Sequence, residues 1–397
     1  MKTILIGAGA AGLFFAGLYQ KDLLILDKND QAGRKLLATG NGRCNFTNLN
    51  LSDDFYFSSN EGFYSYALRA NDNKALIAHL NGLGILTTNL PSGRCYPQTL
   101  SSKTVRDILF MRANGKFIFE ADVLDIDFNK KLVITKDAKY AYDRLVIATG
   151  GKSLPGSGSD GKIFKILKKV HNLRDFSYAI TNYKCQNPLS KRAKGVRVTA
   201  KASLYIDGKF INSSTDDVIF QPYGLTGTAI LDLSNQISYG LFKNSDIRVQ
   251  LDLLSSYDFK EVLDILSDLS GKYKDMSLRE LLTGFINEKL IFDLVKISGL
   301  REDRKAKSLS GKDLKKITAS LKNLEFRIKE INDVENAQVT IGGIDTKFVN
   351  PKTFESKNIK DLFFIGEVLD VDGACGGYNI QWAYSSAKAC ADYLNKN

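Results

Sequence analysis

One stretch near the N-terminus decides the fold: Thr3-Ile-Leu-Ile-Gly-Ala-Gly-Ala-Ala-Gly12. Its first four residues are β-branched or apolar, as in a buried strand of a parallel sheet. Three glycines follow at once, and apolar residues at helical spacing continue to Tyr19. A second apolar run, Leu23-Leu-Ile-Leu26, ends in Asp27. This order predicts a strand, a glycine turn, a helix, a second strand and an acid, which is the opening of a parallel α/β domain.

Each glycine of this turn has its own mechanical role. Gly7 allows the tight turn, Gly9 lets the backbone approach a pyrophosphate, and Gly12 lets the helix pack closely on the strand. The phosphates would lie at the positive end of the helix, where free N–H groups point outward. Asp27 would accept hydrogen bonds from ribose hydroxyls, and its charge disfavours a 2′-phosphate. The pattern therefore predicts a site for FAD or NAD rather than for NADP.

The next segment is dense in glycines, cations and amides: Gly33-Arg-Lys-Leu-Leu-Ala-Thr-Gly-Asn-Gly-Arg-Cys-Asn-Phe-Thr-Asn48. Its cations, Arg34, Lys35 and Arg43, offer charge to phosphates. Its amides, on Asn45 and Asn48, offer hydrogen bonds to a ring or a ribityl chain. Such a loop suits a long, charged ligand. The alternative is an ordinary surface connection rich in Asn and Gly.

Two later segments repeat the form of a buried strand that ends in glycine: Arg144-Leu-Val-Ile-Ala-Thr-Gly-Gly151 and Leu362-Phe-Phe-Ile-Gly-Glu367. After the second, a glycine pair opens a long helix that we expect to run from about residue 376 to about Leu394. The N-terminus of that helix would present positive N–H groups, which suit the N1/O2 edge of a reduced flavin. These features favour FAD over NAD.

Taken together, these motifs resemble the two-dinucleotide-fold flavoproteins. More narrowly, they resemble the aminoacetone-oxidase-type FAD-binding enzymes, a bacterial family that also contains a flavin-dependent reductase of dehydro bile acids. The resemblance spans nearly the whole chain. Its other motifs are Gly93-Arg-Cys-Tyr-Pro97 with Lys103, Tyr223-Gly-Leu-Thr-Gly227, Val339-Thr-Ile-Gly-Gly343 and Gly366-Glu-Val-Leu-Asp-Val-Asp-Gly373.

The chain departs from that family at three positions. Pro222 stands where members commonly have His, Thr228 where they have Pro, and Asp27 where they usually have Glu. If the missing His takes part in chemistry in some members, this protein acts differently or on another substrate.

The resemblance implies roles for several positions. Asp27 would hold the ribose, Val123 would lie by the adenine, and residues 149–151 would lie near the pyrophosphate. Glu367 would lie by the ribityl or pyrophosphate part, and residues 377–380 against the isoalloxazine. Arg94, Tyr378 and Asn379 are candidates for side chains that face the flavin. In all, the predicted cofactor-binding residues are Gly7, Gly9, Ala10, Ala11, Gly12, Asp27, Lys28, Gly33, Arg34, Lys35, Leu36, Thr39, Gly42, Arg43, Cys44, Asn45, Val123, Thr149, Gly150, Gly151, Gly366, Glu367, Gly377, Tyr378, Asn379 and Ile380.

The composition argues against several kinds of structural and active site. The 397 residues include five cysteines without a C-x-x-C pair and only two histidines, which argues against a disulfide framework and against a metal site. A cofactor should therefore carry the chemistry, and no catalytic side chain is predicted. The net charge is +11, and residues 301–330 hold ten Lys or Arg against five acids. We expect a solvated helical face there rather than a binding patch.

Periodicity predicts three domains. The predicted fold class is α/β, with a Rossmann-like FAD-binding domain (1–188 and 345–397), an inserted β-barrel-like domain (189–255 and 323–344) and a small helical domain (256–322). The Asp207-Gly208 pair predicts a hairpin in the β-rich part. Ser277-Leu-Arg-Glu280 predicts a capping box that opens a helix in the helical part.

Other features predict no separate site. Gly156-Ser-Gly-Ser-Asp-Gly161 repeats the glycine spacing but does not directly follow a strand, so we expect a flexible loop that caps a helix. A redox pair of Cys44 and Cys375 is conceivable, although buried single cysteines usually only pack. We expect His79 and His171 at the surface, and Trp382 in the core.

The sequence thus predicts a soluble, cytoplasmic, FAD-dependent oxidoreductase that acts on an unidentified small molecule, with FAD held non-covalently. A nicotinamide donor, if used, would dock transiently. We expect no nucleic-acid partner and no membrane span, and the oligomeric state is not predicted. Two alternatives remain open. One is a tRNA-modifying flavoprotein, motivated by the basic segment 301–330. The other is a non-catalytic flavin-binding redox sensor.

Overall fold

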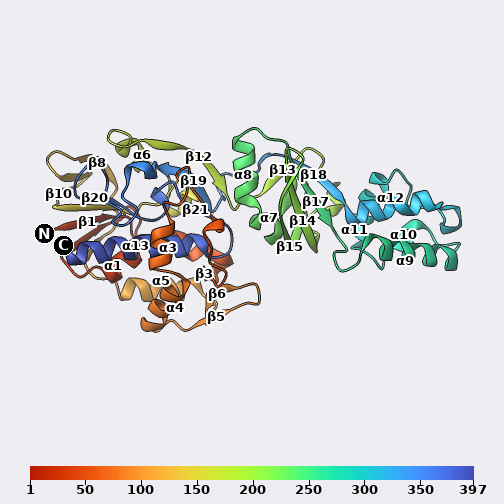
Figure 1. Ribbon diagram of the computed structural model, residues 1–397, viewed down its shortest axis with the longest axis horizontal. Helices are drawn as coiled ribbons and strands as arrows, with labels where there is room; N and C mark the ends of the chain where they lie inside the picture. The colour runs from red at the N-terminus through yellow and green to blue at the C-terminus, as the bar shows by residue number, and fades with distance from the viewer. The chain divides into compact units, whose positions relative to one another are not determined.

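A computed structural model describes residues 1–397 and divides them into two compact units (Figure 1). Unit 1 comprises Met1–Ala179 and Val334–Asn397, and unit 2 comprises Ile180–Asp333. The chain therefore leaves unit 1 once, builds unit 2 and returns, as an insertion. No helix is long and apolar enough to span a membrane.

The centre of unit 1 is a five-stranded parallel sheet in the order β20-β11-β1-β2-β7. Its strands are β1 (Thr3–Ile6), β2 (Leu23–Leu26), β7 (Lys116–Ile118), β11 (Arg144–Ile147) and β20 (Leu362–Phe364). Every residue of β1, β2, β11 and β20 is buried, as expected for a parallel sheet covered on both faces. The predicted Rossmann-type α/β fold is confirmed.

Seven helices belong to unit 1. They are α1 (Ala10–Leu18), α2 (Arg34–Ala38), α3 (Ser65–Ala70), α4 (Asn73–Gly82), α5 (Ser102–Met111), α6 (Ile163–Leu167) and α13 (Tyr378–Lys396). Figure 1 shows α13, in blue, beside α1, in red, and the two helices are in contact. Trp382 of α13 is buried, as predicted, and its Nε1 donates to the carbonyl of Gly366 at 3.1 Å. The first and last parts of the chain therefore share one core.

Smaller sheets complete unit 1. Their strands are β3 (Thr47–Asn48), β4 (Tyr56–Phe57), β5 (Thr87–Asn89), β6 (Arg94–Pro97), β8 (Val123–Asp127), β9 (Leu132–Thr135), β10 (Lys139–Ala141), β12 (Leu173–Ala179), β19 (Val339–Ile344) and β21 (Asp372–Gly373). Strand β19 pairs antiparallel with β12, so both belong to unit 1. The borders predicted at 188/189 and 344/345 consequently move to 179/180 and 333/334.

Unit 2 is built on a closed barrel in the order β13-β16-β15-β14-β17-β18. Its strands are β13 (Tyr183–Cys185), β14 (Arg197–Ile206), β15 (Lys209–Gln221), β16 (Gly224–Thr226), β17 (Ile247–Asp252) and β18 (Leu324–Ile331). The predicted hairpin is confirmed: Asp207 and Gly208 both adopt left-handed φ angles, of 50° and 77°, between β14 and β15.

The helices of unit 2 are α7 (Thr228–Asp232), α8 (Ser234–Phe242), α9 (Phe259–Lys272), α10 (Leu278–Leu282), α11 (Glu288–Ile297) and α12 (Gly311–Lys322). The predicted capping box of Ser277 and Glu280 opens α10. The helical segment is not separated from the barrel, because Val249 of β17 and Leu266 of α9 belong to one buried cluster. Barrel and helices therefore form one unit instead of the two domains predicted.

Candidate cofactor site

The glycine turn between β1 and α1 is shaped by close packing. A Cβ atom at Gly7 would lie 2.6 Å from the carbonyl oxygen of Ala148, and one at Gly12 would lie 2.0 Å from the carbonyl oxygen of Gly7. Neither position has room for a side chain. At Gly9, by contrast, a Cβ would meet nothing within 4 Å. The turn is therefore tight where it packs on the sheet and open on the side where a ligand would approach.

Asp27 is tied to this turn. Its Oδ2 accepts the N–H of Ala8 at 2.6 Å, and its Oδ1 accepts the N–H of Asn29 at 2.8 Å. Burial raises the pKa of the carboxyl group, and these backbone hydrogen bonds oppose that rise. The two bonds fix the carboxylate at the end of β2. Its remaining lone pairs can accept further hydrogen bonds, such as those from ribose hydroxyls.

Helices α1 and α13 both begin without a side-chain cap. Their N-cap residues are Gly9 and Gly377, which have no side chain to accept from the first turn. The first four N–H groups of a helix have no partner inside the helix. Uncapped ends therefore leave backbone donors and the positive end of the helix dipole for an anion or a ring oxygen.

The side chains at the start of α13 are occupied within the protein. The Tyr378 ring is buried and stacks on Phe55, with ring centroids 4.5 Å apart. The Asn379 side chain accepts from the N–H of Gly373 at 2.9 Å and donates to its carbonyl at 2.7 Å. What this segment can offer a flavin is therefore its backbone N–H groups.

The carboxyl end of β11 brings residues 149–151 beside the glycine turn. A Cβ at Gly7 would lie 3.0 Å from the Cα of Thr149, and a Cβ at Gly150 would lie 3.6 Å from Oε2 of Glu367. Two buried hydroxyls here, Thr149 Oγ1 and Ser159 Oγ, have no hydrogen-bond partner. Buried polar atoms are nearly always paired. These orphaned hydroxyls, together with the open face of Gly9, fit a polar ligand such as the pyrophosphate and ribose of a dinucleotide.

The segment from Gly33 to Asn48 mostly bonds to the protein itself. Its side-chain contacts are Arg34 to Asp30 (2.7 Å), Lys35 to Glu367 (2.7 Å), Thr39 to the carbonyl of Leu36 (2.6 Å), Asn45 to the carbonyls of Thr47 (3.0 Å) and Cys95 (2.9 Å), and Asn48 to the carbonyl of Gly376 (3.2 Å). The amides of Asn45 and Asn48 thus hold this loop against β6 and the start of α13. Arg43 is exposed, with its guanidinium 5.5 Å from the Tyr96 ring centroid.

Cys44 is not suited to redox chemistry as a thiolate. It is fully buried, and burial raises the pKa of its thiol to about 12. All five cysteines are free, so Cys44 and Cys375 form no disulfide. The thiol of Cys44 therefore stays protonated at neutral pH and packs as a small apolar group.

The predicted site residues converge from four parts of unit 1: the glycine turn, Asp27, the end of β11 and η7 (Gly366–Val368). A Cβ at Gly366 would lie 2.7 Å from Cβ of Ala11, which places η7 against the first turn of α1. Val123 begins β8 and is half-buried, and none of these contacts involves it. Sequence reasoning missed Ser159 because it lies in the second glycine run, and it missed Thr340, whose N–H donates to Glu367 at 2.8 Å.

The expectation of a surface position is wrong for His171. It is 4% exposed, its Nε2 lies 2.8 Å from Ser356 Oγ, and its ring packs edge-on against Phe364. Burial lowers its pKa to about 4. These neighbours come from distant segments of the chain, so nothing in the sequence around His171 predicted its burial. His171 lies outside the converging segments, and half-buried His79 packs near the rings of Phe14 and Tyr384.

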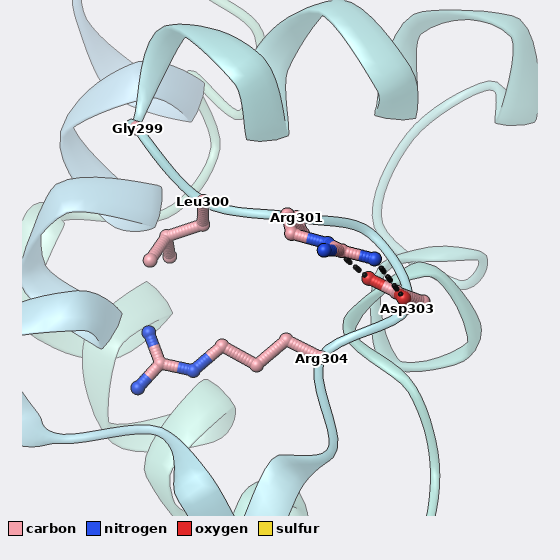
Figure 2. A pocket seen from close by; sticks show the side chains of 5 residues that line it. All are labelled: Gly299, Leu300, Arg301, Asp303 and Arg304. Atoms are coloured by element: carbon pink, nitrogen blue, oxygen red, sulfur yellow. Dashed lines mark hydrogen bonds and ion pairs between the residues drawn. The ribbon is translucent and has the colours of Figure 1, made fainter.

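A cavity of about 400 Å³ in unit 2 is lined by Gly299, Leu300, Arg301, Asp303 and Arg304. Figure 2 shows the Arg301 guanidinium facing the Asp303 carboxylate, at 2.7 Å, while Arg304 points away from that pair. Arg304 donates to the carbonyl of Ser308 at 2.6 Å and pairs with Asp313 at 3.0 Å. Because both cations are already matched, this cavity is not a ready anion site.

Comparisons with known proteins identify the family. The family model described as "HI0933-like protein Rossmann domain" matches residues 1–393. The chain is 28% identical over 393 residues to the 3-dehydro-bile acid delta(4,6)-reductase of Clostridium scindens, and the match covers 96% of each protein. It is 30% identical over 401 residues to the ribosomal RNA dihydrouridine synthase of Escherichia coli, covering 99% of this chain and 97% of that one. The corresponding enzyme of Haemophilus influenzae is also 30% identical, over 409 residues, with coverage of 98% and 97%.

Among solved structures, a 3-ketosteroid delta1-dehydrogenase from Sterolibacterium denitrificans aligns with 100% of this chain and 99% of its own, at a TM-score of 0.48 and 10% identity. The family resemblance drawn from the sequence motifs is confirmed by the family model and the relatives. The chain belongs to the HI0933-like family of FAD-binding Rossmann proteins, and it is an FAD-dependent oxidoreductase.

Proposed function

We propose that this enzyme reduces a carbon–carbon double bond conjugated with a carbonyl group in a small organic substrate. The observation that carries the proposal is the whole-length similarity to relatives whose names describe that chemistry. One relative is named for reduction at positions 4 and 6 of a 3-dehydro compound, and the others for making dihydrouridine from uridine. A conjugated carbonyl is common to both substrates, and it activates the double bond towards hydride.

The residues of unit 1 fit the binding part of this function. The turn at Gly9 and the start of α1 would hold the pyrophosphate, Asp27 the ribose, and the backbone at the start of α13 the ring. Reduced FAD, when bound, supplies the hydride. The first-turn N–H groups of α13 would stabilise negative charge on a reduced flavin bound there. Neither histidine is among the residues proposed to hold FAD, so we propose that the proton comes from solvent or from a group on the substrate-binding side of the site.

The direct test uses the purified protein with FAD under anaerobic conditions. The flavin is reduced with NADH, NADPH or dithionite, and its reoxidation is followed by absorbance after addition of a candidate acceptor. We expect rapid reoxidation by a conjugated enone and none by the matching saturated ketone or isolated alkene. Equal rates with all three acceptors would contradict the proposal. Comparing the rates of flavin reduction by NADH and by NADPH also identifies the electron donor.

A second candidate is reduction of uridine within RNA. Two observations favour it: the dihydrouridine synthases at 30% identity, and the unmatched charge in residues 301–330. Five of the ten cations there form ion pairs, namely Arg301, Arg304, Lys307, Lys322 and Arg327. The other five do not, namely Lys305, Lys312, Lys315, Lys316 and Lys329. Unpaired lysines can contact phosphates.

Mass spectrometry of RNA from cells with and without the gene tests this second candidate. Loss of dihydrouridine from one RNA position on deletion would select RNA over small enones as the substrate. An unchanged RNA, together with turnover of a small enone, would select the first proposal.

We also propose a cytoplasmic location, where five free cysteines would stay reduced. Cell fractionation tests it.

A further inference from the structure

Four segments of unit 1 meet at the carboxylate of Glu367. Lys35 Nζ, from α2, lies 2.7 Å from Oε2. Ser153 Oγ donates to Oε1 at 3.1 Å, and the N–H of Thr340, from β19, donates to the same oxygen at 2.8 Å. Lys35 Nζ also donates to Ser153 Oγ at 2.7 Å. The carboxylate therefore accepts three hydrogen bonds, and the ammonium group is bound on two sides.

This cluster lies beside the region where the structure fits a pyrophosphate. A Cβ at Gly150 would lie 3.6 Å from Glu367 Oε2 and 3.1 Å from the unpartnered Oγ of Ser159. Glu367 belongs to η7, which packs against Ala11 in the first turn of α1. A carboxylate is thus built next to the place where a ligand with two negative charges is expected. Like charges so close oppose binding unless a cation compensates them.

Lys35 is the cation placed to do so. The Lys35 and Glu367 side chains are 25% and 20% exposed, so solvent screens their interaction only in part. The neighbouring Arg34 is bonded to Asp30 instead, with side chains 36% and 58% exposed. We propose that Lys35 is a positioning residue that acts through Glu367: it neutralises this carboxylate so that the pyrophosphate of FAD can bind beside it. It is not an independent phosphate ligand. The proposal depends on FAD as the cofactor and not on which substrate is reduced.

The test is a double-mutant cycle on the apoprotein. Wild type, Lys35→Met, Glu367→Gln and the double variant are titrated with FAD by fluorescence quenching, and the melting temperature of each apoprotein is measured. Lys35→Met should weaken FAD binding by about tenfold or more, because it leaves the carboxylate uncompensated. The double variant should bind within about threefold of Glu367→Gln alone. Its apoprotein should also recover the melting temperature that Lys35→Met loses.

Two results would overturn the proposal. If the double variant binds FAD more than about threefold more weakly than Glu367→Gln alone, Lys35 is a direct phosphate ligand. If Lys35→Met binds like wild type, it has no role in binding. Arg34→Met is the matched control, since its exposed ion pair should change FAD affinity by less than about threefold. A wild-type protein that bound no FAD would instead contradict the cofactor assignment, and the apoprotein melting temperatures would still report whether the pair is coupled.

Discussion

Two runs of this chain share the spacing G-x-G-x-x-G, but they differ in the elements that flank them and in what surrounds their first glycines. The first, residues 7–12, follows β1 and opens α1. A Cβ added at either of its outer glycines would lie within 3.0 Å of backbone atoms. The second, residues 156–161, follows Leu154 and Pro155 and begins in a 3-10 turn (Pro155–Ser157). At Gly156 an added Cβ would meet nothing within 4 Å. Spacing alone therefore does not define a nucleotide turn; the preceding strand and the close backbone contacts do.

The second run nevertheless contributes to the first one's site. The Asn29 amide donates to the carbonyl of Ser157 at 3.2 Å, and Lys28 pairs with Asp160 at 2.6 Å. Ser159 lies against Gly150. The expected flexible loop is thus anchored to the residues that directly follow Asp27. The comparison separates a turn that we propose binds phosphate from a loop that holds neighbouring residues in place. Four predictions test this distinction.

The largest effect is expected for Gly12→Ala. The new methyl group would lie 2.0 Å from the carbonyl oxygen of Gly7, a backbone atom that cannot move aside. We expect unit 1 to lose more than ~4 kcal/mol of stability and the protein to bind no FAD. Gly156→Ala, in the second run, places its methyl group where no atom lies within 4 Å and should alter stability by less than ~0.5 kcal/mol. Melting curves of the two apoproteins check this, and equal stabilities would refute the distinction.

Gly9→Val should abolish binding without unfolding the protein. Gly9 has a φ of −74°, which any residue can adopt, and its Cβ direction is open in the ligand-free chain. The side chain would fill the space of the pyrophosphate, so we expect FAD affinity to fall by ~100-fold or more. The melting temperature of the apoprotein should stay close to that of wild type. Unchanged FAD binding would show that the ligand does not approach this glycine.

Asp27→Asn should weaken both the apoprotein and the holoprotein. Asp27 accepts two backbone N–H groups, and an amide would turn an NH₂ donor towards one of them. We expect a loss of ~2–3 kcal/mol in apoprotein stability, together with weaker FAD binding. Asp160→Asn, in the second run, removes partly exposed ion pairs with Lys28 and Lys162 and should cost less than ~1 kcal/mol. Denaturant titrations of both variants measure these losses of stability. A larger loss for Asp160→Asn than for Asp27→Asn would contradict the supporting role given to Asp27.

The smallest effect concerns His171, which follows the helix entered from the second run. Its pKa is lowered from 6.5 to about 4 by burial, so the unfolded chain takes up a proton before the folded chain does. The stability that neutral His171 contributes is intact above pH 6.5 and is lost as the pH falls towards 4.

His171→Gln keeps an acceptor for the Ser356 hydroxyl and removes the titration. The variant should therefore lose less stability than wild type between neutral pH and pH 4, as measured by urea unfolding across that range. Parallel pH profiles for the two proteins would show that His171 is not buried as the structure has it.

The sequence predicted the parts that carry local signals. Apolar runs bounded by glycine marked β1, β2, β11 and β20, and a glycine pair marked the start of α13. Distant pairings left no such signal. The pairing of β12 with β19 places both strands in unit 1, so the domain borders differ from the predicted ones. The Lys35–Glu367 pair joins residues 332 positions apart. The unpartnered Thr149 hydroxyl and the open face of Gly9 also emerge only once four segments are brought together.

A crystal structure of the protein reconstituted with FAD tests the central assignment most directly. One FAD molecule should lie with its pyrophosphate over Gly9 and its ring beside the first turn of α13, within bonding reach of the Thr149 and Ser159 hydroxyls. A flavin bound elsewhere, or side chains filling the space over Gly9 in the loaded protein, would contradict the assignment.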